Sequence, residues 1–182
     1  FNPIVDITFC GSDVLGFGPK NEVCIQGAVD TDFLKPVYYD INANRQNVII
    51  GHFPTSAKGY EIIQEVINKV KNNRPIIEFR YDNVHTSFTE HIKRVSACDI
   101  YIEDMSDNQA GVPLTTFGIT TLEAASLGKI VCTRFPDLPI YERLFGKCGI
   151  QVTNNKHELE EKLRTILSMS DVNFLELQIK FY

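Results

Sequence analysis

From residue 47 onward, short apolar runs alternate with segments whose apolar residues recur at helical spacing. The uninterrupted run at 48–51 is typical of a strand covered on both faces. The segment 58–72 carries one apolar helical face made of Ile62, Ile63, Val66, Ile67 and Val70. Because strands that alternate with helices pair in parallel through right-handed crossovers, we expect an α/β fold with a doubly wound, Rossmann-like parallel sheet over residues 47–168.

The same patterns place the remaining elements along the chain. Before the alternation begins, strands are expected at 4–9 and 22–26, and an irregular connector with turn residues follows at 28–46. We place a domain boundary or hinge in that connector. Further strands are predicted at 75–79, 99–102, 130–132 and 149–152, and further helices at 87–96, 119–127, 138–145, 155–168 and 171–182.

The stretch 115–134 reads as a loop, a helix and a buried strand, with Gly118 before the helix and Gly128 after it. The first N–H groups of a helix lack partners and carry about half a unit of positive charge, which suits a phosphate. Glu123 lies one turn further in, where its carboxylate could accept hydrogen bonds from two ribose hydroxyls. The residues alone equally allow Glu123 to be a solvated carboxylate favoured by the helix dipole.

Two residues after the first strand of the alternation could also meet a phosphate. Lys58 opens a helix beside Gly59, where a cation is unfavourable unless an anion such as a diphosphate lies nearby. The alternative is a lysine that extends into solvent. His52 ends the strand and could donate to a phosphate or a sugar hydroxyl, although a structural role is the commoner one for such a histidine.

Two other loops follow predicted strands at the same edge of the sheet. The long segment 103–116 favours a substrate-facing or mobile role, but we assign no catalytic role to its acids, Glu103, Asp104 and Asp107. The loop after the second strand of the alternation, which holds Val84, could lie against a nucleotide base.

Composition excludes several classes of function. The formal net charge of −5 argues against broad binding to a phosphate backbone, so nucleic acid is not an expected partner. The five cysteines include no CxxC pair and read as reduced thiols. The four histidines show no metal-ligand spacing, and we expect no metal. No apolar run approaches the roughly 20 residues of a membrane-spanning helix, which predicts a cytoplasmic protein, with peripheral association at the inner face of the membrane as an alternative location.

Four stretches together resemble a known family. They are GAVDTDFLKP at 27–36, HFPTSAKGYEIIQEV at 52–66, CDIYIED at 98–104 and FGITTLEAASLGKIV at 117–131. In this order they resemble the C-terminal, nucleotide-sugar-binding domain of GT-B-fold glycosyltransferases, most closely retaining family four, also called glycosyl transferases group 1. The resemblance covers residues 22–168.

The resemblance implies roles for individual residues. Lys58 would bind the donor diphosphate and Glu123 the ribose hydroxyls, which makes them the two residues with an implied catalytic role. The wider implied donor-binding set adds His52, Gly59, Val84, Thr115, Phe117, Gly118, Ile119 and Thr120. Three positions depart from the family pattern: Thr115 replaces a glutamate that faces the donor sugar, His52 an arginine and Ile130 a proline.

As an expectation from this resemblance, the protein transfers a sugar from a nucleoside-diphosphate donor to a carbohydrate or lipid-linked acceptor. It would be a retaining, hexosyltransferase-type enzyme with no obligatory metal and no cofactor besides its nucleotide-sugar substrate. Residues 1–46 would be the remnant of an N-terminal domain and the hinge, and residues 169–182 a helix that packs toward that domain. Because the acceptor-binding N-terminal domain is missing from this chain, we expect the chain alone to be inactive.

Two other functions fit the same fold. A non-catalytic Rossmann-like module would bind a nucleotide or a protein without turnover. A nucleotide-sugar epimerase would convert the nucleotide sugar without any acceptor. The sequence does not indicate which base, sugar or acceptor the protein would use.

Overall fold

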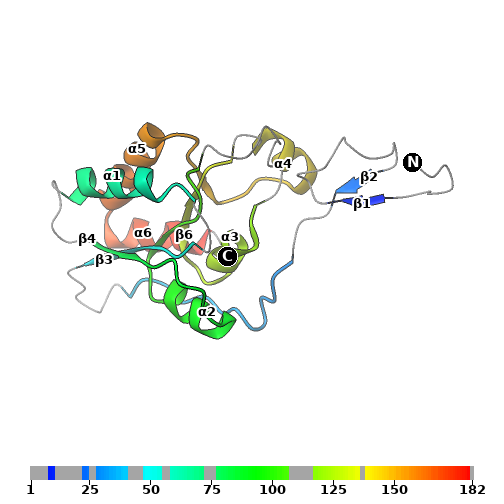
Figure 1. Ribbon diagram of the computed structural model, residues 1–182, viewed down its shortest axis with the longest axis horizontal. Helices are drawn as coiled ribbons and strands as arrows, with labels where there is room; N and C mark the ends of the chain where they lie inside the picture. The colour runs from blue at the N-terminus through cyan, green and yellow to red at the C-terminus, as the bar shows by residue number, and fades with distance from the viewer. Residues whose placement is uncertain are drawn as a thin grey trace.

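In a computed structural model, a five-stranded parallel sheet lies between two layers of helices (Figure 1). The structure describes residues 8–10, 22–24, 28–40, 47–54, 58–71, 77–106, 117–135 and 138–180. The strand order is β4-β3-β5-β6-β7, as the doubly wound prediction requires. The five strands are β3 (Val48–His52), β4 (Ile77–Tyr81), β5 (Ile100–Ile102), β6 (Ile130–Thr133) and β7 (Gln151–Val152).

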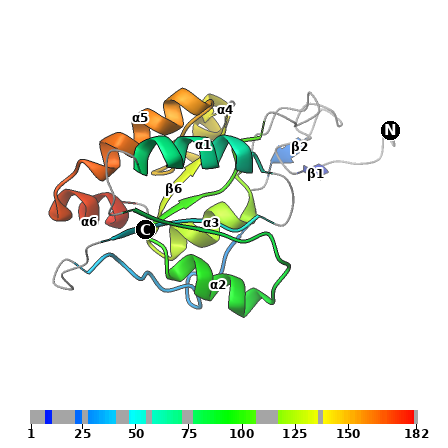
Figure 2. The ribbon, with the colours of Figure 1, turned by 60° about the vertical axis from the view of Figure 1, so that its left-hand side comes forward.

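Helices cover both faces of this sheet, which confirms the predicted fold class. On one face, α1 and α5 lie side by side, and α2 and α3 lie on the other (Figure 2). Side chains alternate accordingly, because Ile100 and Ile102 of β5 pack with α1 and α5 while Tyr101 packs with α2 and α3. The helices are α1 (Tyr60–Lys71), α2 (Phe88–Ser96), α3 (Ile119–Ser126), α4 (Leu138–Phe145), α5 (Lys156–Leu167) and α6 (Asp171–Ile179).

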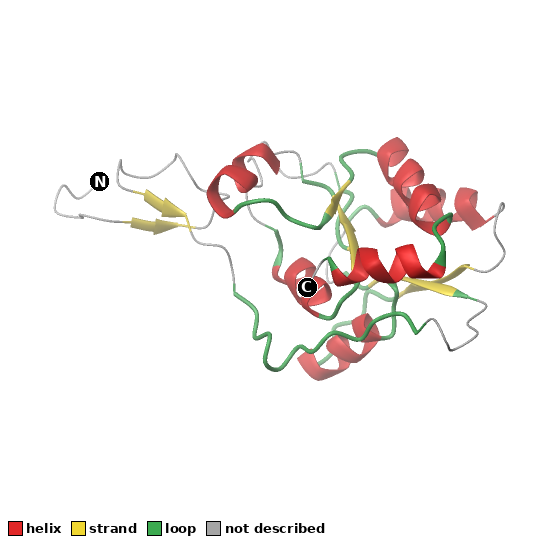
Figure 3. Cartoon of the chain, turned by 180° about the vertical axis from the view of Figure 1, so that it is seen from behind, coloured by secondary structure: helices red, strands yellow, loops and turns green. Residues whose placement is uncertain are grey.

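The predicted elements are all present, with shifted ends. The strand expected at 75–79 is β4, which begins at Ile77 and continues to Tyr81 because its pairing with β3 extends that far. The two early strands are shorter than expected, β1 (Thr8–Cys10) and β2 (Glu22–Cys24), and form a parallel pair that stands apart from the main sheet (Figure 3). Residues 4–7 and 25–26 of those predictions lie outside the described residues.

The connector packs along the sheet rather than away from it. Leu34 is buried between α2 and α3, and Tyr39 joins the core formed with α1, α5 and α6. The Val37 amide donates to the carbonyl of Leu127 at 2.9 Å, and the buried Lys129 side chain donates to the Val37 carbonyl. The first stretch of the expected hinge is therefore tied to the domain. The predicted domain boundary at residue 47 is not tested by these contacts and stays a prediction.

Gln178 of α6 joins that connector to the sheet. Its side-chain oxygen accepts from the Tyr39 amide at 2.7 Å, and its side-chain nitrogen donates to the carbonyl of Asp99 at 3.2 Å. The ring of Phe174, one turn earlier, packs against the Tyr39 ring. The packing of the C-terminal helix toward an N-terminal domain stays a prediction.

The order of the strands positions the candidate site. β3 pairs with β4 on one side and β5 on the other, so the crossover from β3 to β4 and the crossover from β4 to β5 run in opposite directions across the sheet. In open α/β sheets, such a switch point opens a crevice beyond the carboxyl ends of the strands. The segments that follow β3 and β5 meet at this point, and they carry Lys58 and Glu103.

Candidate functional site

The segments after β3 and β5 are joined by an ion pair. Lys58 donates from Nζ to Oε1 of Glu103, and the backbone repeats the contact because the Met105 amide donates to the Lys58 carbonyl at 3.0 Å. Glu103 is only 4% exposed. The lysine that was expected to face a diphosphate therefore has a buried carboxylate as its partner in this structure.

The environment of Glu103 disfavours its charged form. Burial raises the pKa of Glu103, while the Lys58 ammonium, the strongest opposing influence, acts to lower it. The Tyr101 hydroxyl also faces this carboxylate. Within the described part of the chain, Oε2 of Glu103 is buried and has no hydrogen-bond partner.

The start of α3 lies against the same carboxylate. Gly118 is the N-cap residue and provides no side-chain cap, and a Cβ built on it would lie 3.5 Å from Oε1 of Glu103. The first N–H groups of α3 have no partner within the helix itself. Lys58, Glu103 and the positive end of α3 thus lie close together, and a helix start beside a lysine is the kind of position at which a phosphate group binds.

Glu123 lies one turn into α3, where it is 9% exposed. Burial, and secondly the negative charge of Glu103, raise the pKa of Glu123. Its Oε2 lies 3.9 Å from Nε2 of His91 on α2, beyond hydrogen-bond distance. Burial lowers the pKa of His91, which favours the neutral form of its imidazole.

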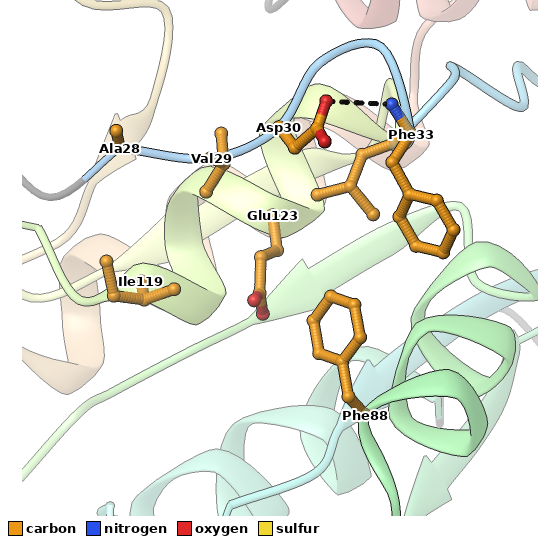
Figure 4. Close-up of a pocket in the computed structure, with 8 residues that line it drawn as sticks. Ala28, Val29, Asp30, Phe33, Phe88, Ile119 and Glu123 are labelled. Carbon is orange, nitrogen blue, oxygen red and sulfur yellow. Dashed lines mark hydrogen bonds between the residues drawn. The ribbon is translucent and has the colours of Figure 1, made fainter.

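Glu123 forms the floor of a cavity of about 400 Å³ between α2, α3 and the connector (Figure 4). The Phe33 and Phe88 rings lie on the opposite side, with centroids 6.1 Å apart and planes 28° from parallel. Asp30 fixes the connector there by accepting from the amides of Asp32 and Phe33. The cavity is lined by Ala28, Val29, Asp30, Phe33, Leu34, Phe88, Ile119 and Glu123.

This cavity suits a ligand with a flat apolar part and hydroxyl groups. Its walls are mainly apolar, and its two ionisable lining residues, Asp30 and Glu123, are both acids. A carboxylate accepts hydrogen bonds from hydroxyls and repels phosphate. Phosphate is favoured instead at the neighbouring position, where α3 begins and Lys58 lies.

Two of the predicted donor-binding residues, His52 and Phe117, have side chains that contact other parts of the fold. His52 is fully buried, and its Nδ1 contacts the Ile102 carbonyl at 2.8 Å. The Phe117 ring stacks on Phe135 with a 4.1 Å centroid distance and meets Tyr141 of α4 edge-on. These contacts hold β3 against β5 and the start of α3 against α4.

The backbone explains why glycine stands at position 59. Gly59 has φ of +75°, and a Cβ there would lie 2.5 Å from the carbonyl carbon of Met105. The missing side chain thus makes room for the segment after β5. Contact between Gly59 and a donor stays a prediction.

The other predicted residues are distributed unevenly around the site. Ile119 lines the cavity, and Thr120 lies beside it in the first turn of α3. Val84 is exposed in the segment between β4 and α2, outside the set that lines the cavity, and its amide donates to Asp82 at 2.8 Å. Thr115 lies outside the described residues.

Three residues at the site are not predicted from the sequence to belong to it: Phe33, Phe88 and His91. Phe33 and Phe88 are 55 positions apart in the printed sequence and meet only because the connector docks on α2. No periodicity marks such a pair. The polar partner of His91 is Glu123, 32 positions away in the sequence, and the pairing is visible only in the structure.

Neither a metal centre nor a membrane span is apparent among the described residues. They contain no group of three or more His, Cys, Asp or Glu side chains placed to hold a metal ion. Within the same part of the chain, every helix is too short or too polar to cross a bilayer.

Comparison with solved structures places this fold among known ones. The chain is similar to Anabaena Alr3699/HepE, solved in complex with UDP-glucose, with a TM-score of 0.57 and 18% sequence identity. A second HepE structure, with UDP and glucose, gives a TM-score of 0.57 and 17% identity. The match covers 89% of this chain but only 52% and 51% of the HepE chains, so this chain spans about half their length. No protein-family model and no curated protein sequence matches the chain. At this identity, the comparison establishes a shared α/β Rossmann-like fold.

Proposed function

We propose that this chain is the donor-binding part of a glycosyltransferase, which transfers a sugar from a nucleoside diphosphate to a carbohydrate or lipid-linked acceptor. One observation carries the proposal: the cavity floored by Glu123 adjoins the point where Lys58 meets the start of α3. A nucleoside diphosphate has the matching order of groups, from an apolar base through ribose hydroxyls to phosphates.

The nucleoside occupies the cavity. The two ribose hydroxyls donate to the Glu123 carboxylate, and the base lies against the exposed rings of Phe33 and Phe88. Stacking of a base on an aromatic side chain contributes about 1–3 kcal/mol and tolerates different bases. Because a carboxylate on the cavity floor would repel phosphate, the orientation of the nucleotide is fixed with its phosphates outside the cavity.

The diphosphate lies at the start of α3. The positive end of the α3 dipole and the Lys58 ammonium stabilise the charge that develops as the diphosphate departs. Loss of one such donor typically costs about 3–4 kcal/mol in catalysis. These groups do the work that a divalent cation does in other enzymes, and the proposed reaction has no obligatory metal.

The proposed reaction needs more than this chain supplies. The HepE structures hold UDP-glucose or UDP with glucose, and this chain matches about half of the HepE length. Both facts support a nucleotide-sugar site completed by a second domain that binds the acceptor. Hexosyl transfer with retention of configuration belongs to the same proposal, and the chain alone would bind donor without turnover.

Calorimetric titration of the whole chain with UDP, GDP and ADP tests the proposal. One nucleotide should bind, and Glu123→Ala and Lys58→Ala should each weaken it by about 1–3 kcal/mol, or roughly 5-fold to 150-fold. Glu161→Ala, an exposed carboxylate on α5, is the matched control and should bind like the wild type. Absence of binding by all three nucleotides at millimolar concentration, in a folded sample, would overturn the donor-site assignment.

A further inference from the structure

The carboxylate of Glu103 lies where the proposed function places the donor diphosphate. Its Oε1 is paired with Lys58 and lies next to the N-cap glycine of α3, Gly118. The donor-free protein therefore pairs Lys58 with a carboxylate of its own, which also lies beside the start of α3. A diphosphate that approaches the same two groups must meet this carboxylate.

The charges around Glu103 come from four segments. Lys58 faces it from the segment after β3, Tyr101 from β5, Asp104 from its own loop and Glu123 from α3. Two neutral imidazoles also respond to the Lys58 charge, those of His52 and His91. Among these groups, Lys58 is the cation, and it cannot balance an ionised Glu103 and a doubly charged diphosphate together.

We propose that Glu103 is a positioning residue that takes up one proton when the donor diphosphate binds, releases Lys58 to the diphosphate and donates its carboxyl O–H to a phosphate oxygen. The proton comes from solvent, and no covalent bond to the donor is made or broken. The inference rests on the proposed function, because it takes the ligand to be a nucleoside diphosphate.

Two observations besides the ion pair support this role. Oε2 of Glu103 is buried and unpartnered within the described residues, so a second polar group can bind to this carboxyl without displacing an existing hydrogen bond. Burial already raises the pKa of Glu103 in the donor-free protein, and departure of Lys58 together with arrival of an anion raises it further. Protonation of Glu103 therefore costs less free energy than keeping an ionised carboxylate beside the diphosphate.

The proposed proton uptake predicts the direction in which donor affinity changes with pH. If one proton is taken up on binding, affinity falls by about tenfold for each pH unit above the pKa of donor-free Glu103. This dependence continues up to the pKa of the bound form. A structural role for Glu103, limited to holding Lys58, produces no such slope.

The test is calorimetric titration of the whole chain with UDP-glucose at about pH 7.5, in two buffers of different ionisation enthalpy. Both phosphates of UDP-glucose are esterified, so the ligand itself has no phosphate proton to exchange near neutral pH. We expect uptake of close to one proton per UDP-glucose by the wild type. Glu103→Gln, which keeps an N–H donor at this position, should bind with no uptake and with affinity independent of pH.

Three further variants identify the group that takes up the proton. Glu161→Gln, an exposed control on α5, should keep the uptake of the wild type. His52→Asn and His91→Gln should keep it as well, and loss of uptake in either histidine variant would overturn the assignment to Glu103.

The two proposals fail in different ways. Binding of UDP-glucose without proton uptake, or with equal uptake by Glu103→Gln, would overturn the role of Glu103 and leave the donor site standing. If neither UDP-glucose nor UDP binds the folded wild type, the proposed donor site for uridine nucleotides fails, and the inference about Glu103 fails with it.

Discussion

The imidazole of His52 on β3 donates from Nδ1 to the carbonyl oxygen of Ile102 on β5, at a distance of 2.8 Å. Because a carbonyl oxygen only accepts, this contact assigns the proton of the neutral ring to Nδ1. The ring is fully buried, and burial lowers the pKa of His52 to about 4. Nε2, the ring's other nitrogen, is buried and has no hydrogen-bond partner among the described residues, so protonation would leave a charged N–H there without an acceptor.

This arrangement predicts acid sensitivity. The folded protein keeps His52 neutral, while the unfolded chain protonates it near pH 6.5. The stabilisation is complete above pH 6.5 and is lost as pH falls toward about 4, by up to about 3 kcal/mol. Urea unfolding at both pH values should show a smaller acid-induced loss for His52→Asn than for the wild type. An identical loss in the two proteins would contradict the prediction.

A second prediction concerns the two glycines that follow α3 and α4. Gly128 and Gly146 both have positive φ, but a Cβ on Gly128 would lie 2.7 Å from the Tyr38 ring, while Gly146 has nothing within 4 Å. Gly146→Ala should cost about 1 kcal/mol from backbone strain alone. Gly128→Ala should cost about 1–3 kcal/mol more, because the connector must shift. Equal losses in thermal unfolding would show that the contact with Tyr38 contributes nothing.

A third prediction concerns the side chain that ties α6 to the connector. Gln178→Ala removes the hydrogen bond between the Tyr39 amide and the Gln178 side chain and should destabilise the fold by about 1–3 kcal/mol. Amide hydrogen exchange offers a local readout. Exchange at Tyr39 should accelerate more than exchange in α4, whereas uniform acceleration would indicate a global effect only.

A fourth prediction separates binding from packing with two phenylalanines. Phe88 is 51% exposed at the cavity, whereas Phe117 is buried against Phe135. Phe88→Ala should weaken nucleotide binding by about 1–3 kcal/mol and leave the melting temperature nearly unchanged. Phe117→Ala should cost about 3–5 kcal/mol of folding stability. If Phe88→Ala binds the nucleotide with unchanged affinity, the base does not lie in this cavity.

The sequence predicts the sheet well because its strands and helices are defined by local patterns. The apolar runs at Val48 and Ile130 and the helical spacing around Ile63 each report burial that depends on near neighbours in the chain. Element ends were less accurate, as the two-residue shift of β4 shows, since pairing with β3 rather than composition decides where that strand stops.

The candidate site was predictable only where a local rule applied. Glu123 and Gly118 followed from the loop and helix around them, and Lys58 from its unfavourable place beside a helix start. The partner of Lys58 was not predictable, because 45 positions separate it from Glu103 and only the order of the strands brings the two together. The Phe33–Phe88 pair depends in the same way on the docking of the connector.

The contact between Gln178 and Tyr39 closes a loop of 139 positions with one side chain. The last described part of the connector and the last helix are thereby joined at one place, beside Asp99, which directly precedes β5. One side chain therefore couples α6 and the connector at the amino end of β5, whereas Lys58 and Glu103 meet beyond its carboxyl end.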